Sequence, residues 1–468
     1  MGLTEEFAKF VHGTGFEDMP EEAVSKSKEM FLDSIGVAIA GTVEEPSGNI
    51  AIKYAKEVRA APEASVLGGG FRTWAPMAAF ANALLAHNMD YDDWLPAGTE
   101  EENWPKNAGH ASGIMVAVAL ALGEKLGLPG KRIIEAYVLG MESYTKIAIN
   151  CGDPRERGWH SMGVYGCIGA TAAAAKLLGL NVQQITMAFG IASSFAGGLR
   201  RSLRSMTNPL HAGCAARAGI EAALLAKEGF TSGEAILEAP TGMIGFCEAF
   251  VGKGGCDYER ISQSLGKPFY VVSPGPGIKP YPCAWPTFYA AEAIMELRKE
   301  HGVAYEDVKE VEAWVVPSSY ARIGDPEPKS GYAGRLSWEY VCAAALLDGK
   351  LVRDTFRNGR LKDVKFREAL GKVKLVPDEK RAEEKGTFFA PIVMKLKDGR
   401  EYRHQVDVCK GHPKNPLTHE EVVAKYRNNA GLVLSQQQIA RSIELIEHLD
   451  AAKDVRELMD ILATRAVS

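Results

Sequence analysis

The sequence predicts a mainly α-helical protein, with a large all-helical domain and a smaller α+β domain inserted near its C-terminal end. Three observations lead to this prediction. Apolar helical runs follow one another through the first half of the 468 residues. This helical pattern ends at a proline-rich stretch, VVSPGPGIKPYPCAWP at 271–286, and alternating strand patterns occur only after it. A chain of this length also exceeds the usual size of one core.

The first domain, residues 1–266, begins with a helix-start signal. Asp18 is a possible cap, and proline and two acids follow it where a first turn favours them. Gly41 is the expected stop of this helix. Further helices are expected at 75–87, 111–127, 131–149, 163–179, 183–196 and 211–229. Several are alanine-rich on all sides, as in GATAAAAKLLGL, which predicts buried helices in close contact.

The second domain, residues 267–411, mixes helices and strands. The proline-rich stretch is a linker or an irregular active-site segment, and a helix is expected at 287–300. VKEVEAWVVP and FAPIVMKLKDGREYRHQVDV alternate like strands, the second with a DG turn. SWEYVCAAALLDG and the charged RLKDVKFREALGKV between them are expected to be helical. The remaining residues, 412–468, return to amphipathic helix and should pack back on the first domain.

Composition and charge narrow the classes of function. The net charge of −5 argues against a general nucleic-acid binder, which usually presents a basic face. The first residues carry acids where a signal peptide needs a basic flank. Apolar runs such as GIMVAVALALG are too short to span a bilayer. We therefore expect a cytoplasmic protein that binds neither nucleic acid nor membrane.

The spacing of the cysteines bears on metal clusters. They stand at positions 151, 167, 214, 247, 256, 283, 342 and 409, and no two are separated by two residues. Zinc ribbons and clustered iron–sulfur ligation therefore find no support. Buried free thiols in a reducing compartment are the expectation.

The segment LAHNMDYDDWLPAGTEEENWPKNAGHASG, residues 85–113, gathers acids after an apolar helix. The run from Asp90 resembles half a calcium loop, but Leu95 stands at the sixth loop position, where glycine is needed, and Leu95 and Gly98 offer no side-chain oxygen, so we expect no metal here. A solvated loop is a good account of Glu100, Glu101 and Glu102. It is a weaker account of Asp90, which follows the buried face of the helix by one turn.

His160, in GWHSMGVYGCIGA, precedes an expected helix, where backbone N–H groups and the helix dipole favour an anion. A neutral histidine there would be a suitable base for a substrate that carries a carboxylate. A capping or packing histidine is the alternative, and the residue types leave both open.

Two further segments carry cationic side chains. Arg200, Arg201 and Arg204 lie shortly before His211 and another expected helix, and arginine binds carboxylates through two parallel hydrogen bonds. A solvated or dimer-facing turn is the alternative reading of this segment. Lys279, before a proline on the linker, could be held over a cleft, where loss of solvent would make it a better base.

Taken together these segments resemble the 2-methylcitrate dehydratase family, also written MmgE/PrpD, which includes cis-aconitate decarboxylase and iminodisuccinate epimerase. The resembling phrases are LLAHNMDYDD, GWHSMGVYGCIGATAAAAKLLGL, SMTNPLHAGCAARAG, KPYPCAW, LSWEYVCAAALLDG and GHPKNPLTHEEVVAKYR. They occur along nearly the whole chain. The resemblance implies a helical domain, an α+β lid domain, a homodimer, and no metal or organic cofactor.

The family's cleft residues match this chain at Asp90, His110, His160 and Lys279, which we take as the catalytic candidates. The substrate-binding candidates are Trp94, Arg200, Arg201, Arg204, Asn208, His211 and Tyr281. Two of these positions depart from relatives: Trp94 replaces a threonine of cis-aconitate decarboxylases, and Asn208 replaces a lysine of many members. The stretch between Asp90 and His110 is also longer than usual, and it includes Glu100, Glu101 and Glu102.

These departures should lower the affinity of the expected pocket for a tricarboxylate, because a lysine is lost, acids are added and an indole takes up space. The expected chemistry is proton transfer at a carbon next to a carboxylate. His160 and Lys279 would be the acid/base pair, His110 would hold a carboxylate or donate a proton, and Asp90 would orient a cation. We expect a hydro-lyase acting as a dehydratase on a small hydroxy acid. Epimerisation of an amino diacid, decarboxylation of the cis-aconitate type, and a non-catalytic dimeric scaffold are the alternatives.

Overall fold

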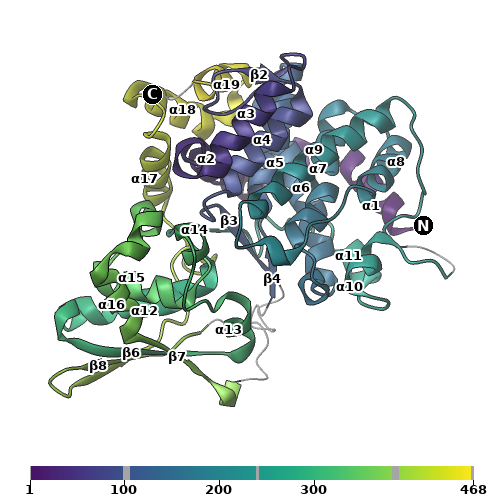
Figure 1. Ribbon diagram of the computed structural model, residues 1–468. Coiled ribbons are helices and arrows are strands. Elements are labelled where there is room, and N and C mark those ends of the chain that lie inside the picture. The colour runs from purple at the N-terminus through teal and green to yellow at the C-terminus, as the bar shows by residue number, and fades with distance from the viewer. Residues whose placement is uncertain (1, 98–105, 239–241, 382–388, 465–468) are drawn as a thin grey trace. The chain divides into compact units, whose positions relative to one another are not determined.

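The computed structural model describes residues 2–97, 106–238, 242–381 and 389–464 (Figure 1). The chain divides into two compact units. Among the described residues, the first unit comprises 2–97, 108–278 and 418–464, and the second comprises 106–107 and 279–417. The sequence-based boundaries, after 266 and 411, lie slightly earlier along the chain. For the first boundary the reason is that residues 267–278 end in a short strand that pairs within the first unit.

The first unit is built from apolar helices. α7 (Ser161–Leu178) packs against α6 (Gly130–Asn150) and α9 (Thr207–Lys227), and α4 (Ala75–His87) packs against α9 and α5 (Ser112–Leu126) (Figure 1). The other helices of this unit are α1 (Leu3–Gly13), α2 (Glu21–Glu44), α3 (Pro46–Glu57), α8 (Val182–Ser193), α10 (Phe246–Val251), α11 (Tyr258–Ser264), α17 (His419–Ala430), α18 (Gln436–Glu447) and α19 (Arg456–Leu462).

The small residues of α7 and α9 bring these two helices into close contact, as their composition predicts. A Cβ placed on Gly219 of α9 would lie 2.4 Å from the Cβ of Ala170 on α7, so only glycine fits there. Within the described residues, α7 is also the one helix long and apolar enough, by length and composition, to cross a membrane. Since 94% of it is buried inside the protein, it is a core helix.

The two ends of α2 differ from the prediction. Asp18 accepts a hydrogen bond from the Gly15 backbone N–H and so belongs to a short 3₁₀ turn, while Pro20 takes the N-cap position of α2. Gly41 does not stop the helix, which continues to Glu44. A Cβ at Gly41 would lie 2.4 Å from the carbonyl oxygen of Leu85, so this glycine permits close packing of α2 against α4.

The C-terminal tail packs on α2. The Lys425 ammonium of α17 lies 2.5 Å from the Asp33 carboxylate of α2, and both side chains are buried. Lys425 also donates a hydrogen bond of 2.7 Å to the carbonyl oxygen of Tyr91 and lies 4.0 Å from the centre of that ring. The tail therefore fixes the segment that follows α4.

Two small sheets accompany the helices of the first unit. β1 (Ala64–Ser65) pairs with β2 (Arg72–Thr73), and a three-stranded sheet has the order β4-β3-β5. The strands of this second sheet are β3 (Asp93–Ala97), β4 (Lys106–Gly109) and β5 (Gly277–Ile278). Asp93 pairs with Ile278, and Trp94 pairs with Gly277. The solvated loop considered for this segment is thus a strand as far as Ala97, whereas Glu100, Glu101 and Glu102 lie outside the described residues.

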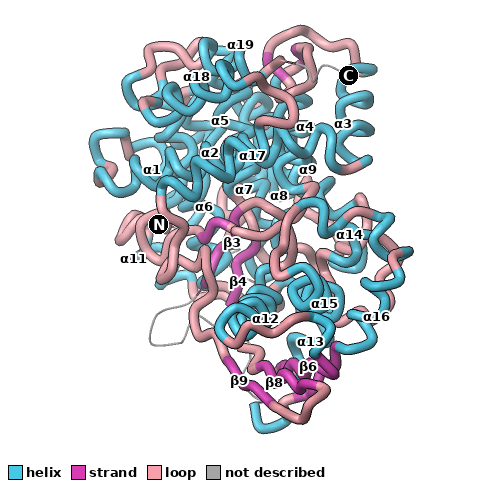
Figure 2. The backbone as a smooth tube through the Cα atoms, turned by 90° about the vertical axis from the view of Figure 1, so that its left-hand side faces the viewer, coloured by secondary structure: helices cyan, strands magenta, loops and turns pink. Residues whose placement is uncertain are grey.

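The second unit is an α+β structure, as the alternating patterns predict. Its sheet has the order β7-β6-β8-β9, and α12 and α15 lie on one side of it in Figure 2. Val311, Ala313 and Val315 alternate toward the buried face of β6. The strands are β6 (Val308–Val315), β7 (Val373–Pro377), β8 (Ile392–Leu396) and β9 (Glu401–His404). The helices are α12 (Phe288–Glu300), α13 (Pro317–Ile323), α14 (Gly331–Gly334), α15 (Trp338–Asp348) and α16 (Val364–Lys372).

The expectation that all cysteines are free thiols is wrong for one pair. Cys151 and Cys256 form a disulfide across a sequence separation of 105 residues. The segments that carry them run antiparallel, since the Gly152 N–H donates to the carbonyl of Gly255 at 2.7 Å. The remaining cysteines are free. Spacing along the chain contains no sign of this pair, because the fold alone brings the two segments together.

Candidate active site

The end of α4 places three polar side chains in the interior of the first unit. His87 is the last residue of the helix, and Asp90 and Asp92 follow it; all three are at most 4% exposed. The His87 Nδ1 lies 2.8 Å from the Asp92 carboxylate. Asp90 has a backbone φ of 51°, a left-handed conformation that aspartate tolerates better than most residues and that is common at functional sites.

The Asp93 side chain binds the first residue of α5, Ser112, which lies two residues after His110. Its carboxylate accepts hydrogen bonds from the Ser112 hydroxyl at 2.7 Å and from the Ser112 N–H at 3.1 Å. Burial, and then the neighbouring Asp92 charge, raise the pKa of Asp93 to about 7. Its carbonyl oxygen contacts His110 Nδ1. Since a carbonyl can only accept, Nδ1 of His110 carries the hydrogen in this contact.

His160 precedes α7 at the N-cap position, but its side chain makes no capping hydrogen bond. Instead its Nδ1 lies 2.8 Å from the Nδ1 of His211 on α9. Burial is the largest cause that lowers the pKa of His160 well below 6.5, followed by His211, His87, His110 and Arg155. The capping alternative therefore does not describe this histidine, which is neutral at pH 7.

The four imidazoles form a row, which we call the histidine cluster: His110, His87, His160 and His211. Ring centres are 5.0 Å apart between His110 and His87, 6.5 Å between His87 and His160, and 5.1 Å between His160 and His211. Asp90 and Asp92 lie at the His87–His110 end. The structure thus brings together Asp90, His110, His160 and His211 of the predicted residues.

Donor atoms of His87, Asp90, Asp92 and His110 lie within 4.8 Å of one another, a spacing at which such side chains could hold a metal ion. Two of these nitrogens are already engaged, however, because His87 Nδ1 pairs with Asp92 and His110 Nδ1 with the Asp93 carbonyl. We therefore read the group as a hydrogen-bonded network.

Basic side chains gather beside His160. Arg200 is partly buried at the start of a 3₁₀ turn, and burial and then the nearby Arg155 lower its pKa. Arg155 itself binds the Asp153 carboxylate at 2.7 Å. Arg201 and Arg204 are exposed, although Arg204 also contributes to the lowered pKa of Arg200.

The other predicted residues lie on several elements. Trp94 of β3 is 1% exposed, and Asn208 is buried in the first turn of α9. Because α9 begins at Thr207, His211 lies inside this helix and not before it. Lys279 is fully buried and directly follows β5. Tyr281, in the second unit, shares a hydrogen bond with Glu292, and its ring packs edge-on against Phe288.

Family models for both halves of the molecule match the sequence. The MmgE/PrpD N-terminal domain matches residues 5–257, and the MmgE/PrpD C-terminal domain matches residues 281–451. The chain belongs to the MmgE/PrpD family. This confirms the resemblance and the mainly helical fold it implies.

Relatives in this family include named enzymes. The cis-aconitate decarboxylase of Homo sapiens is 29% identical over 98% of this chain and 94% of its own length. The cis-aconitate decarboxylase of Mus musculus is 29% identical over 98% of this chain and 93% of its own length. That of Aspergillus terreus is 25% identical over 98% of this chain and 96% of its own length. The similarity thus extends through both units of this MmgE/PrpD protein.

Sequence reasoning missed three residues of this MmgE/PrpD site: His87, Asp92 and Arg155. A signal for His87 exists, since it stands three residues before Asp90, about one helical turn away. Asp92 stands two residues after Asp90 in the same acidic run. For Arg155 the sequence offers little, because its place beside His160 depends on the turn that begins at Asp153.

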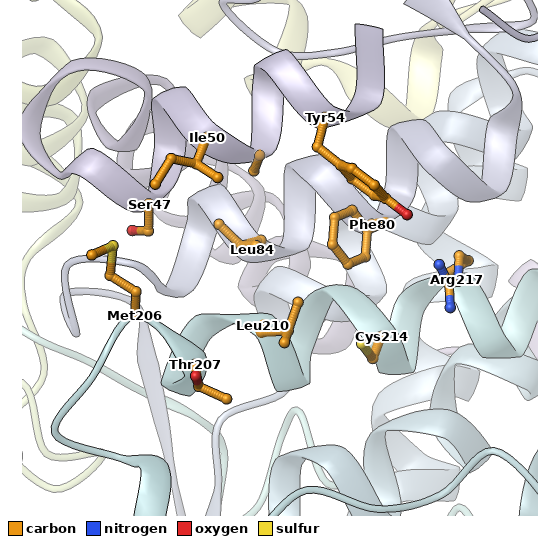
Figure 3. A pocket seen from close by; sticks show the side chains of 11 residues that line it. Ser47, Ile50, Tyr54, Phe80, Leu84, Met206, Thr207, Leu210, Cys214 and Arg217 are labelled. Carbon is orange, nitrogen blue, oxygen red and sulfur yellow. The ribbon is translucent and has the colours of Figure 1, made fainter. Parts of the chain in front are cut away.

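An apolar groove lies on the same helices but apart from the cluster. Ile50 and Tyr54 of α3, Leu84 of α4, and Leu210 and Cys214 of α9 line it (Figure 3). Ile50 is 57% exposed. The groove lacks the titratable cluster that acid/base chemistry needs, so the candidate active site is the histidine cluster.

Proposed function

We propose that this protein is a lyase that transfers a proton at a carbon next to a carboxylate of a small di- or tricarboxylate, with dehydration as its first candidate reaction and no cofactor. The observation that supports this is the pairing of a base and an acid in one buried cluster. His160 is neutral at pH 7, whereas His110, at the other end of the row, lies 3.9 Å from the Asp92 carboxylate. Dehydration needs both kinds of group.

In this proposal His160 removes the proton from carbon. The electron pair of the broken C–H bond first forms a carbanion that the adjacent carboxylate stabilises. It then forms the new double bond as the C–O bond breaks, and the leaving hydroxide takes a proton to depart as water. His110 donates that proton. Lys279 stabilises the negative charge that develops on the substrate carboxylate, and Asp90 orients a cation. Ile278 of β5 pairs with Asp93 of β3. Lys279 is the next residue along the chain, which supports this role.

The substrate class follows from the basic side chains near His160. Arg200 offers a partly buried guanidinium group that recognises carboxylates, and Arg155, which is paired with Asp153, adds positive charge beside His160. The buried Trp94 and the neutral Asn208 reduce the room and the positive charge for a third carboxylate. We therefore favour a compact hydroxy diacid over a large tricarboxylate.

Decarboxylation is the second candidate, and the names of the relatives favour it. In that reaction the substrate's C–C bond breaks, carbon dioxide leaves, and the carbanion takes a proton from a cluster histidine. It needs an acid but no base for a C–H bond. The neutral His160–His211 pair is the reason for placing dehydration first.

One experiment separates these candidates. The protein is incubated in deuterium oxide with a panel of hydroxy, amino and unsaturated di- and tricarboxylates, and products are followed by NMR. An alkene formed from a hydroxy acid supports dehydration, and release of carbon dioxide supports decarboxylation. Deuterium exchange with inversion and no other product supports epimerisation. If no acid of the panel gave a product or exchanged a proton, the enzyme proposal would be contradicted and the dimeric scaffold favoured.

Variants then test the assigned residues. Loss of a general base, or of a group that stabilises charge in the transition state, typically costs about 10²- to 10⁴-fold in rate. We expect His160→Gln and Lys279→Ala to lose activity on this scale on the substrate that the panel identifies. His419→Gln is the matched control, since His419 is exposed and pairs with Glu447 on the surface. Near-normal turnover in both site variants would overturn the assignment.

We also propose, as the resemblance implies, that the protein is a cytoplasmic homodimer. The apolar groove supports a protein–protein contact, because Ile50, Tyr54 and Met206 expose large apolar side chains along it. Light scattering of the wild type should give the mass of two chains. Ile50→Glu should shift it toward one chain, whereas Lys53→Glu on the same helix should not.

A further inference from the structure

We propose that His87, paired with Asp92, is the proton reservoir of the site and supplies the proton that His110 gives to the leaving group. This inference rests on the proposed function. It concerns two residues to which neither the family resemblance nor the site motifs assign a role.

The geometry of His87 carries the inference. It lies between two other imidazoles of the row, 5.0 Å from the His110 ring centre and 6.5 Å from that of His160. It is buried, as is Asp92, which it meets at 2.8 Å through Nδ1. A carboxylate at this distance holds an imidazole in its charged form and fixes its orientation. His87 also ends α4, where the helix dipole favours a cation.

The charged groups around His87 come from four elements. Asp90 and Asp92 follow α4, and Asp92 Oδ1 lies 3.9 Å from His110 Nδ1 as well. His110 precedes α5, His160 precedes α7, and His211 lies on α9. Asp92 thus bridges two histidines at one end of the row, while the other end carries the buried His160–His211 pair. One end of the row is suited to hold a proton and the other to accept one.

His110 is the member through which His87 acts. The His110 side chain is 13% exposed, against 3% for His87, so it is the more accessible of the two rings. After His110 has given its proton to the leaving hydroxide, it is neutral, and His87 restores that proton. The proton that His160 took from carbon then returns to His87 or to solvent. The balance is one substrate to one alkene and one water, with the cluster unchanged.

Because His87 acts through another residue, it is a positioning residue, and its test needs more than lost activity. In deuterium oxide, His87→Gln should still remove the carbon-bound proton, because His160 is intact. The carbanion should then take up deuterium more often than it loses hydroxide. We expect elimination to fall about 10²-fold or more, and exchange at that carbon to persist or rise.

Asp92→Asn is the second variant, since it keeps the imidazole and removes only its carboxylate. We expect the basic limb of its kcat/KM profile to move to lower pH, because the imidazolium has lost its partner, and Asp92→Glu should restore part of the shift. A measurement without substrate accompanies these: NMR of the histidine side chains at pH 7 should show His87 protonated in the wild type and neutral in Asp92→Asn. His419→Gln is the control for assignment and activity.

Failure of this inference can be distinguished from failure of the proposed function. If the wild type acts on no acid of the panel, the proposed function fails, and the NMR measurement alone decides whether His87 holds a proton. A neutral His87 in the wild type would overturn the inference. So would normal elimination in His87→Gln, or equal loss of exchange and elimination in a variant whose thermal midpoint is unchanged.

Discussion

The Nδ1 of His160 lies 2.8 Å from the Nδ1 of His211, and both side chains are buried. Two ring nitrogens at this distance need a hydrogen between them, so one ring donates and the other accepts. A second charge on the pair would be placed next to the first with little solvent to screen it. The pair is therefore a site that stays neutral until a substrate proton reaches it.

The pH dependence of activity should show this neutrality. Burial, and then His211, lower the pKa of His160 below 6.5, so the neutral base persists as pH falls. We expect the acid limb of kcat/KM to lie below pH 6.5 in the wild type. In His211→Gln it should move to higher pH, because one cause of the lowered pKa is removed. An acid limb at or above pH 6.5 in the wild type would contradict the assignment of His160 as base.

Asp93 predicts a pH dependence of stability. Its pKa is about 7 in the folded protein and 3.8 as the ordinary value, so the folded state binds the proton more tightly. This contribution to stability is present below pH 3.8 and is lost as pH rises toward 7. The free energy of unfolding of the wild type minus that of Asp93→Asn should therefore fall between pH 4 and 7, by up to about 1.4 kcal/mol per pH unit. Denaturant melts measure this difference, and a constant value would contradict the prediction.

The Lys425–Asp33 pair should link the C-terminal tail to the site. Removing one member of a buried ion pair leaves the other charge uncompensated, which typically costs about 3 to 5 kcal/mol. We expect Lys425→Met to lose stability on this scale, and Asp33→Leu combined with Lys425→Met to recover most of it. Activity should stay low in both, because the Tyr91 carbonyl, between Asp90 and Asp92 in sequence, has lost its donor. Thermal melts and kcat/KM separate the two effects, and full activity in the double variant would contradict the link.

The sequence predicts the helices well because their patterns are local. The run at 75–87 coincides with α4, and the small residues of α7 and α9 correctly indicate close helix contact. The elements it misses depend on distant partners. β3 forms because residues 277–278 pair with it, and β7 because β6 lies beside it in parallel. No local periodicity shows such pairing.

The same distinction applies to the site. Asp90, His110 and His160 were found through motifs, and the structure places them in one buried cluster. His87 is the last residue of the helix predicted at 75–87, and Asp92 belongs to the acidic run that follows it. Only the fold places His87 Nδ1 2.8 Å from the Asp92 carboxylate. Contacts between residues five apart depend on the turn between them, which the left-handed conformation of Asp90 sets.

The Cys151–Cys256 disulfide gives a prediction that also bears on the proposed location. Under denaturing, non-reducing conditions a thiol reagent should titrate only the free cysteines at 167, 214, 247, 283, 342 and 409. After reduction it should titrate two more. A link that closes a loop of 105 residues should stabilise the fold by about 4 to 5 kcal/mol in the loop-entropy account, so Cys151→Ser combined with Cys256→Ser should lower the thermal midpoint. Cys214→Ser, a free and partly exposed thiol, is the matched control. Eight reactive thiols before reduction in protein taken directly from cytoplasm would show that the pair is reduced there, since reducing compartments keep most thiols free.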